Sequence, residues 1–417
     1  MTGKPLTPRR GEEVLRAIEE EYGEVVRAAS APGRADFLNT HQDYKGLPVV
    51  PVAVNLRTYA AVVEELPDRF EIISLNLKRE GAEHVDAFPL KPVLKGGGWF
   101  GDYFRAVVIA LREAGYEVRR GCRVVVDSDV PIGGGLGSSA ALEVALLKLL
   151  DAYYGAGLSR KEIAELAFKA ENAIMGIPCG RLDQYGSSYG GAILLHTRPP
   201  YHVEELPLGA INLVIADSGI RHRVADIHPR RQAEIERGLS QLLEMSDLPQ
   251  RLRELLGRRY WEPRWEELRL EELEPYLDRV EAKAADRIRF TLLMHHTTLL
   301  ALKLIRERSL SARELEEIGL EPGATFMEAL GAILNKQHEL LRDLYEVSLP
   351  ELEAIRDAML EAGAYGAKIS GAGLGGALIA LVDEGAGSRV ATAALEAGAS
   401  RAWIVRVDEG AREEAWR

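Results

Sequence analysis

The sequence predicts an α+β protein with two domains, and three observations lead to this prediction. The chain has 417 residues, which is enough for roughly two or three domains with cores of their own. Strand-like and helix-like runs alternate through the first half, until the pair Pro199-Pro200 interrupts the pattern. A buried strand at 211–216 then leads into long helices and a closing set of strands. We therefore expect an N-terminal domain over residues 1–206 and a C-terminal domain over residues 207–417.

The first half alternates β-rich runs with segments of helical period. Apolar alternation predicts the strands, and apolar residues spaced three and four apart predict the helices. The expected strands are Leu38–Val54, Tyr59–Val63, Phe70–Ile73, Cys122–Val130 and Ala192–His196, and the expected helices are Phe104–Glu113, Glu143–Leu150 and Arg160–Met175.

The second half has its helices first and most of its strands last. Its long helical patterns have the length of globular-protein helices, and its short apolar runs are bounded by glycine-rich turns. Helices are expected at Gln232–Leu255, Ala285–Arg308, Phe326–Leu341 and Ser388–Ala397, and strands at Ile211–Ala216, Ala367–Ser370, Ala377–Val382 and Ala402–Val407.

The composition is typical of a globular protein and argues against several functions. Hydrophobic residues make up 47% of the chain and charged residues 28%. A net charge of −12 argues against a nucleic-acid-binding surface. The N-terminus has no apolar signal-peptide core, and the apolar run 49–54 is too short to cross a bilayer. We expect neither a nucleic-acid partner nor a membrane-bound protein.

The cysteine content indicates a reducing compartment. The two cysteines, Cys122 and Cys179, cannot build a disulfide framework, and no neighbouring Cys or His gives a zinc-binding spacing. A cytoplasmic protein is expected.

The segment Pro131–Leu142, P-I-G-G-G-L-G-S-S-A-A-L, carries the strongest functional signal. It follows an apolar run and opens a helix, so backbone N–H groups and the positive helix end converge on one spot. Glycines let the backbone approach a polyphosphate, and serine hydroxyls add donors or a Mg²⁺ ligand. The alternative is a glycine-rich turn without a ligand.

A second glycine-rich segment, Gly371–Gly376, matches G-x-G-x-x-G by letter. The dinucleotide fingerprint requires a helix after the glycines, whereas the apolar run A-L-I-A-L-V that follows here predicts a strand. A tight loop between two strands is therefore expected, with space for a group packed against it. A purely structural β-turn is the alternative.

A third segment, Ala31–Gly46, gathers polar side chains within a few residues. Its sequence is A-P-G-R-A-D-F-L-N-T-H-Q-D-Y-K-G. Clustered donors and acceptors suit a ligand with many hydroxyls and little charge, such as a sugar. The alternative is a solvated turn.

Six segments in order resemble the signature regions of the GHMP kinases, and more specifically of the galactokinases. They are the three glycine-containing segments above, F-G-D-Y-F-R-A-V from Phe100, A-E-N-A-I-M-G-I-P-C-G-R-L-D-Q ending at Gln184, and L-R-D-L-Y-E-V-S-L-P-E-L-E from Leu341. The resemblance implies a two-domain GHMP kinase fold. Its N-terminal domain would be similar to ribosomal protein S5 domain 2, its C-terminal domain would be ferredoxin-like α+β, and the active site would lie between them.

The resemblance also implies a reaction. The enzyme would use ATP and Mg²⁺ to phosphorylate the anomeric (C1) hydroxyl of galactose or a related monosaccharide. Its partners would be the sugar and Mg-ATP, and it would be a monomer or homodimer. A sugar hydroxyl is a poor nucleophile, so a carboxylate within hydrogen-bond reach would take its proton as the oxygen attacks the γ-phosphorus.

Residue roles carry over from the family motifs position by position. The catalytic aspartate is Asp183, and its supporting arginine is Arg34, which would stabilise the carboxylate and the transferred phosphoryl group. The resemblance implies Mg²⁺ ligands at Ser139 and Glu171. Nucleotide contacts are implied at Gly133, Gly134, Gly135, Leu136, Gly137, Ser138, Ser139, Ala140 and Gly373, and substrate contacts at Asp36, Thr40, His41, Asp43, Arg181 and Gly371.

The chain departs from the galactokinase pattern where substrate is chosen. Galactokinases carry Glu-His-x-Asp in the sugar loop, whereas a threonine, Thr40, precedes His41 here. Asp36 replaces an asparagine, and Arg181 replaces an apolar residue. One hypothesis is that Arg181 and the change to Thr40 admit a sugar with a carboxylate, for example galacturonate. The alternative is that Arg181 points outward or pairs with Asp36 and galactose recognition is intact.

Two other functions are compatible with the motifs. A GHMP kinase for another small alcohol would share the phosphate loop, although His41 and Asp43 argue for a ligand with several hydroxyls. A catalytically silent, galactokinase-like regulator would bind sugar and nucleotide without turnover. Such a regulator is expected to have lost part of the phosphate loop, which is intact here.

Overall fold

The computed structural model describes residues 4–221 and 224–416, and the side chains of that range except 224–227. The chain forms two compact units made of non-contiguous segments. Unit 1 comprises residues 1–6, 36–50 and 194–404, and unit 2 comprises residues 7–35, 51–193 and 405–417. Together they hold two sheets and numerous helices, so the predicted α+β class is confirmed.

The expected domains over residues 1–206 and 207–417 stay a prediction, and the two compact units divide the chain differently. The segment 36–50 belongs to unit 1 although it precedes residue 206, and the segment 405–417 belongs to unit 2 although it follows residue 206. The chain passes between the units within the strands Arg27–Leu38, Ala192–His196 and Arg401–Arg406 and near the start of Val50–Leu66.

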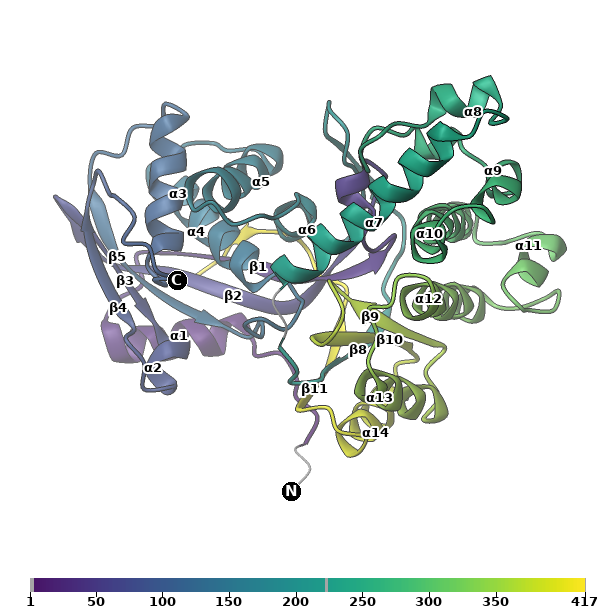
Figure 1. Ribbon diagram of the computed structural model, residues 1–417. Coiled ribbons are helices and arrows are strands. Elements are labelled where there is room, and N and C mark those ends of the chain that lie inside the picture. The colour runs from purple at the N-terminus through teal and green to yellow at the C-terminus, as the bar shows by residue number, and fades with distance from the viewer. Residues whose placement is uncertain (1–3, 222–223, 417) are drawn as a thin grey trace. The chain divides into compact units, whose positions relative to one another are not determined.

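Unit 2 contains most of the larger sheet, which has helices on both of its faces. The strands run in the order β12-β1-β2-β5-β3-β4, and β6 pairs with β2. Figure 1 shows α3 and α4 on one face and α1 with α2 on the other. The strand bounds are β1 Arg27–Leu38, β2 Val50–Leu66, β3 Arg69–Ser74, β4 Val85–Pro89, β5 Gly121–Ser128, β6 Ala192–His196 and β12 Arg412–Glu413. The helix bounds are α1 Gly11–Tyr22, α2 Leu75–Arg79, α3 Asp102–Glu113, α4 Ser138–Tyr154, α5 Arg160–Phe168 and α6 Leu182–Tyr189, with a π-helical turn η2 at Lys169–Ile174.

The alternation along β2 explains why this sheet is covered on both faces. Ala60 and Val62 belong to the core beneath α3 and α4, whereas Tyr59, Ala61 and Val63 pack with α1. Successive side chains of a strand point to opposite faces, so a strand that is apolar at every position is buried on both sides.

Unit 1 contains a four-stranded antiparallel sheet and a helical layer. The sheet order is β11-β8-β10-β9, with Ala377 opposite Asp217 on one side and Ser370 on the other. Helices α13 and α14 cover one face of it in Figure 1. The strands are β7 His202–Leu206, β8 Asn212–Asp217, β9 Gly366–Ser370, β10 Ala377–Val382 and β11 Arg401–Arg406. The helices are α7 Val224–Glu244, α8 Gln250–Leu255, α9 Leu270–Leu277, α10 Ala282–Glu307, α11 Ala312–Glu317, α12 Phe326–Asp343, α13 Pro350–Glu361 and α14 Gly387–Glu396, with 3-10 turns at Asp43–Lys45 and Trp265–Glu267.

Two of the expected elements were wrong in part. The expected strand Leu38–Val54 is interrupted, because Asn39 and His41 adopt left-handed backbone conformations and turn the chain into the 3-10 turn Asp43–Lys45. The expected helix Gln232–Leu255 is two helices, since α7 ends at Glu244 and α8 begins after Pro249. Pro249 is the N-cap residue of α8, and a turn separates it from the end of α7. Among the residues described, no helix is both long and apolar enough to span a bilayer.

Candidate active site

The glycine-rich loop in unit 2 lies between β5 and the first turn of α4, as the sequence predicts. Gly133, Gly135 and Gly137 all have positive φ angles, of 65°, 74° and 67°. L-residues other than glycine rarely adopt this conformation, so the loop needs its glycines to fold back toward the helix. Ser138 and Ser139 then form the first turn of α4. The loop thus delivers backbone N–H groups and two hydroxyls to a helix N-terminus, which suits a phosphate.

Arg34, within β1, is hydrogen-bonded to this loop. Its backbone N–H donates to the carbonyl of Leu136 at 3.0 Å, and its Nη1 donates to the carbonyl of Gly135. Gly33 is also required, because a Cβ there would lie 3.0 Å from the same Leu136 carbonyl. The strand and the glycine loop therefore form one packed structure within unit 2.

The same arginine holds Asp183, which lies in the first turn of α6. Arg34 Nε and Nη2 both donate to Asp183 Oδ1, at 2.9 and 2.6 Å. The other oxygen, Oδ2, faces the phosphate loop, since a Cβ built on Gly137 would lie 3.4 Å from it. One carboxylate oxygen is thus engaged by a guanidinium while the other faces the anion-binding loop. This arrangement can accept a proton beside a bound phosphate.

Helix α6 is tied to α5 through Glu165. Arg181 Nε donates to Glu165 Oε1 at 2.9 Å, and the Tyr185 hydroxyl donates to the same oxygen at 2.6 Å. The guanidinium of Arg181 also stacks on the Phe168 ring, 3.9 Å from its centroid. The two contacts lie on either side of Asp183 in sequence, so Glu165 helps to fix the turn that carries it.

Glu171 lies in the π-helical turn η2 and meets two side chains of the site. Gln184 Nε2 donates to Glu171 Oε2 at 2.6 Å, and the Ser139 hydroxyl lies close enough to the same carboxyl group to lower its pKa. Burial raises the pKa of Glu171, against the opposing effect of these two side chains. A cation that neutralised the carboxylate would therefore be well placed here.

A further carboxyl group, Glu143, adds to this acidic cluster. It lies one helical turn after Ser139 on α4, is fully buried, and neither of its oxygens has a hydrogen-bond partner among the described residues. Burial and the nearby charge of Glu171 raise the pKa of Glu143 well above its ordinary value.

The residues of this cluster fit Mg²⁺. Within residues 4–221 and 224–416, no three His, Cys, Asp or Glu side chains are spaced to hold a metal ion alone. Mg²⁺ in kinases usually needs only one or two protein oxygen ligands, because water and substrate phosphates complete its shell. A hydroxyl from Ser139 and a carboxylate from Glu171, next to a phosphate-binding loop, form such a set.

In unit 1, the polar segment after β1 is anchored by a buried lysine. Lys368 on β9 donates from Nζ to the carbonyl of Asp36 at 2.8 Å and to Thr40 Oγ1 at 2.7 Å. The backbone N–H of Asp36 donates to Ser370 Oγ at 3.0 Å. Burial lowers the pKa of Lys368 to about 8. The threonine that replaces the family's glutamate thus accepts a hydrogen bond from an amine.

His41 connects this segment to the glycine loop Gly371–Gly376. Its Nε2 lies 3.0 Å from the carbonyl of Ala372, and its Nδ1 lies 3.4 Å from the Tyr44 hydroxyl. The glycine loop joins β9 to β10, which confirms a strand-loop-strand connection rather than a dinucleotide fold. Gly373, at φ 81°, is needed because a Cβ there would lie 2.5 Å from the carbonyl of Val347.

The expected site residues fall into two groups. Unit 2 holds Arg34, Gly133, Gly134, Gly135, Leu136, Gly137, Ser138, Ser139, Ala140, Glu171, Arg181 and Asp183, and unit 1 holds Asp36, Thr40, His41, Asp43, Gly371 and Gly373. Sequence reasoning missed Glu143, Glu165, Gln184 and Lys368. Helical spacing from Ser139 could have found Glu143, and adjacency to Asp183 could have found Gln184. Glu165 and Lys368 carry no local signal, because their partners are distant in sequence.

Three family signatures match the chain. They are the GHMP kinases N terminal domain at residues 102–191, the GHMP kinases C terminal domain at residues 315–400, and the galactokinase galactose-binding signature at residues 18–63. The third covers the polar segment anchored by Lys368, and the first covers the phosphate loop and Asp183.

Curated relatives and solved structures agree with these signatures. A galactokinase from Thermococcus kodakarensis is 30% identical over 374 residues, covering 86% of this chain and 89% of the relative. One from Exiguobacterium sibiricum is 29% identical over 374 residues, covering 88% and 87%. The fold is similar to that of Lactococcus lactis galactokinase complexed with galactose, with a TM-score of 0.75, 24% identity, and coverage of 96% of this chain and 99% of that one. It is also similar to Methanococcus jannaschii mevalonate kinase, with a TM-score of 0.65, 17% identity, and coverage of 93% and 99%.

Proposed function

We propose, on the premise that the chain belongs to the galactokinase family of the GHMP kinases, that it transfers the γ-phosphoryl group of ATP to the anomeric hydroxyl of galactose. The observation that carries the mechanism is the Arg34–Asp183 pair facing Gly137 of the phosphate loop. It supplies a base and a fixed positive charge beside a phosphate-binding loop.

Asp183 is the proposed general base. Its Oδ2 takes the proton of the anomeric hydroxyl while the sugar oxygen forms its bond to the γ-phosphorus. The bond from that phosphorus to the β–γ bridging oxygen breaks, and ADP leaves with the electron pair. Arg34 holds Oδ1, and its charge stabilises the carboxylate and the phosphoryl group during transfer.

The phosphate loop binds the nucleotide in this proposal. Backbone N–H groups of 133–140 and the hydroxyl of Ser138 donate to phosphate oxygens. Ser139 and Glu171 would hold Mg²⁺, which when bound neutralises charge on the β- and γ-phosphates. Gln184 keeps one oxygen of Glu171 engaged and so fixes the direction of the carboxylate.

The sugar is assigned to the segment 36–43 and Gly371, with galactose as the substrate. An acidic sugar is not favoured, because the guanidinium of Arg181 is paired with Glu165 and stacked on Phe168. The alternative of a silent regulator is not favoured either, since the base, its arginine and the phosphate loop are all present. A cytoplasmic enzyme that is a monomer or homodimer stays our prediction.

A phosphorylation screen tests the proposal. Purified protein with ATP and Mg²⁺ is offered neutral hexoses, hexosamines and uronic acids, and ADP release is coupled to product identification. We expect the highest kcat/KM with galactose and little turnover with galacturonate. The acidic-sugar hypothesis would be restored if the enzyme preferred galacturonate and Arg181→Ala abolished that preference. The control variant is Arg342→Ala, at a surface arginine that pairs with Asp343. Sugar binding without turnover of any sugar would indicate a regulator.

A further inference from the structure

The sugar segment, residues 36–43, contains two left-handed residues although neither is a glycine. Asn39 has φ 65° and His41 has φ 64°. This conformation is uncommon for residues with a side chain, and it persists where the surrounding structure holds it. Thr40, between the two, is held by Lys368. The contact that holds the backbone of Asn39 comes from the helical layer of unit 1.

Asn39 is fully buried, and helix α12 provides the acceptor for its backbone N–H. This N–H donates to Oε1 of Gln337 at 3.3 Å, and Gln337 is fully buried as well. A buried backbone N–H that loses its acceptor is costly, because no water replaces the lost partner. Gln337 therefore stabilises the backbone conformation of Asn39 in which this N–H points at α12.

Two threonines of α10 fix the orientation of the Gln337 amide. Its Nε2 donates to Thr298 Oγ1 at 3.0 Å and to Thr297 Oγ1 at 3.3 Å. The two hydroxyls donate their own protons to the carbonyl of Met294, at 2.8 and 2.9 Å, so each hydroxyl oxygen can only accept from the amide. The amide nitrogen of Gln337 must consequently face α10, and its oxygen is left facing Asn39.

Helix α10 also holds the residues that follow the sugar-segment turn. Lys45 Nζ donates to Thr291 Oγ1 at 3.0 Å, and Gln42 Nε2 donates to the carbonyl of Thr291 at 3.3 Å. Figure 1 shows α10 and α12 side by side, and Gln337 bridges them. The stretch from Asn39 to Lys45 is therefore anchored to buried polar groups of both helices.

We propose that Gln337 is a positioning residue for sugar recognition. It holds Asn39 in the left-handed conformation, which sets the direction of the chain from there onward and so places His41 and Asp43 for the sugar hydroxyls. Gln337 acts through this segment and does not touch the sugar itself. The inference rests on the proposed function, and it adds a residue of α12 outside the six segments that carry the family resemblance.

Galactose binding and steady-state kinetics of Gln337→Met test this role, because methionine has a similar length but lacks the amide donor and acceptor. We expect the Kd and KM for galactose to rise about 5- to 20-fold, the effect of losing hydrogen bonds to buried groups. The kcat at saturating galactose and the KM for Mg-ATP should stay within about twofold. A substitution that only destabilised the fold would instead lower the fraction of active enzyme, and hence kcat, without changing the Kd for galactose.

Thr298→Val provides a milder variant and a double-mutant cycle. Removing one of the two hydroxyls that orient the amide should raise the Kd for galactose about 2- to 5-fold. In the Gln337→Met background the same change should have no further effect, because Thr298 acts through the amide. The matched control is Gln250→Met, at an exposed glutamine of α8 that pairs with Glu254, and it should bind galactose as the wild type does.

Unchanged galactose binding by Gln337→Met would overturn the role of Gln337, and so would a loss confined to kcat. If Gln337→Met does not fold, unchanged binding by Thr298→Val refutes the role in its place. An equal effect of Thr298→Val in both backgrounds would contradict the route through the amide. A wild type that binds no galactose would overturn the proposed function as well, and that measurement is made first.

Discussion

Two glycines at opposite ends of α4 have nearly the same backbone conformation but different surroundings. Gly137, before the helix, has φ 67° and would place a Cβ 3.4 Å from Asp183 Oδ2. Gly155, after the helix, has φ 66° and would place a Cβ in open space. An alanine at either position strains the backbone, but only an alanine at Gly137 also contacts the proposed base. Comparing the two variants therefore distinguishes the two effects.

Gly137→Ala should lower kcat at least tenfold, while Gly155→Ala should leave it unchanged. Each alanine costs about 1 kcal/mol of stability for its left-handed conformation, but only the first also places a methyl group in van der Waals contact with Asp183 Oδ2. That methyl group would lie between the proposed base and the phosphate loop, where the reacting groups must approach each other closely. Urea unfolding and steady-state kinetics on both variants check this. Equal activity of the two would contradict the placement of Oδ2.

Lys368 should make the free energy of unfolding change with pH in the alkaline range. Its pKa is lowered by burial from 10.5 to about 8 in the folded protein. Below pH 8 the lysine is charged in both states, whereas between pH 8 and 10.5 the unfolded chain binds more protons than the folded one. The free energy of unfolding must therefore rise with pH across that window.

The contribution of Lys368 to this rise is isolated by comparing variants. The wild type should gain about 2–3 kcal/mol relative to Lys368→Met between pH 8 and 10.5. Lys336→Met, at an exposed lysine of α12, should show no such difference from the wild type. Urea unfolding at the two pH values provides the comparison, and parallel pH profiles for wild type and Lys368→Met would refute the assignment.

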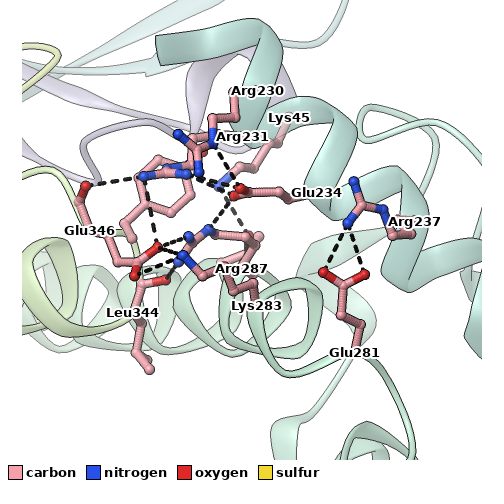
Figure 2. Close-up of polar contacts among 12 residues, drawn as sticks. Lys45, Arg230, Arg231, Glu234, Arg237, Glu281, Lys283, Arg287, Leu344 and Glu346 are labelled. Atoms are coloured by element: carbon pink, nitrogen blue, oxygen red, sulfur yellow. Dashed lines mark hydrogen bonds and ion pairs between the residues drawn. The ribbon is translucent and has the colours of Figure 1, made fainter.

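At the scale of elements, α7, α10 and the turn after α12 are joined by charges of very different burial. Arg287 is fully buried between Glu234 and Glu346 and donates to the carbonyl of Leu344. Arg237 of α7 instead donates from Nη1 to both oxygens of Glu281, the N-cap residue of α10, at the surface (Figure 2). Substituting each arginine compares the stability contributed by a buried ion pair with that contributed by an exposed one.

Arg287→Met should destabilise the protein by about 1.5–3 kcal/mol, because it removes one of the two buried guanidinium groups that donate to Glu234, while Arg231 still pairs with that carboxylate. Arg237→Met should cost at most about 1 kcal/mol. Guanidinium unfolding measures both changes. A loss of under 1 kcal/mol for Arg287→Met would mean that the network does not hold α7 against α10.

At the scale of the whole molecule, prediction from sequence succeeded where the signal was local. The loop 131–142 was recognisable because its glycines and serines are consecutive and flanked by a strand and a helix. The loop at Gly371 was correctly separated from a dinucleotide fold by the strand that follows it.

Prediction was less successful where distant contacts determine the structure. The polar segment after Leu38 was assigned to a strand, although Asn39 and His41 turn the chain there and Lys368 holds it. Gln337 accepts a hydrogen bond from Asn39 although the two residues are 298 positions apart in sequence. Neither relation leaves a periodic or composition signal along the chain.

The central claim is that Asp183 takes the proton of the anomeric hydroxyl during phosphoryl transfer. The most direct test is the turnover of Asp183→Asn with galactose and Mg-ATP, followed by ³¹P NMR, with Asp247→Asn at an exposed aspartate as the control. We expect galactose 1-phosphate from the wild type and the control, and a rate at least 100-fold lower from Asp183→Asn with galactose binding retained. Near-wild-type turnover by Asp183→Asn, or a wild-type product phosphorylated away from C1, would contradict the mechanism.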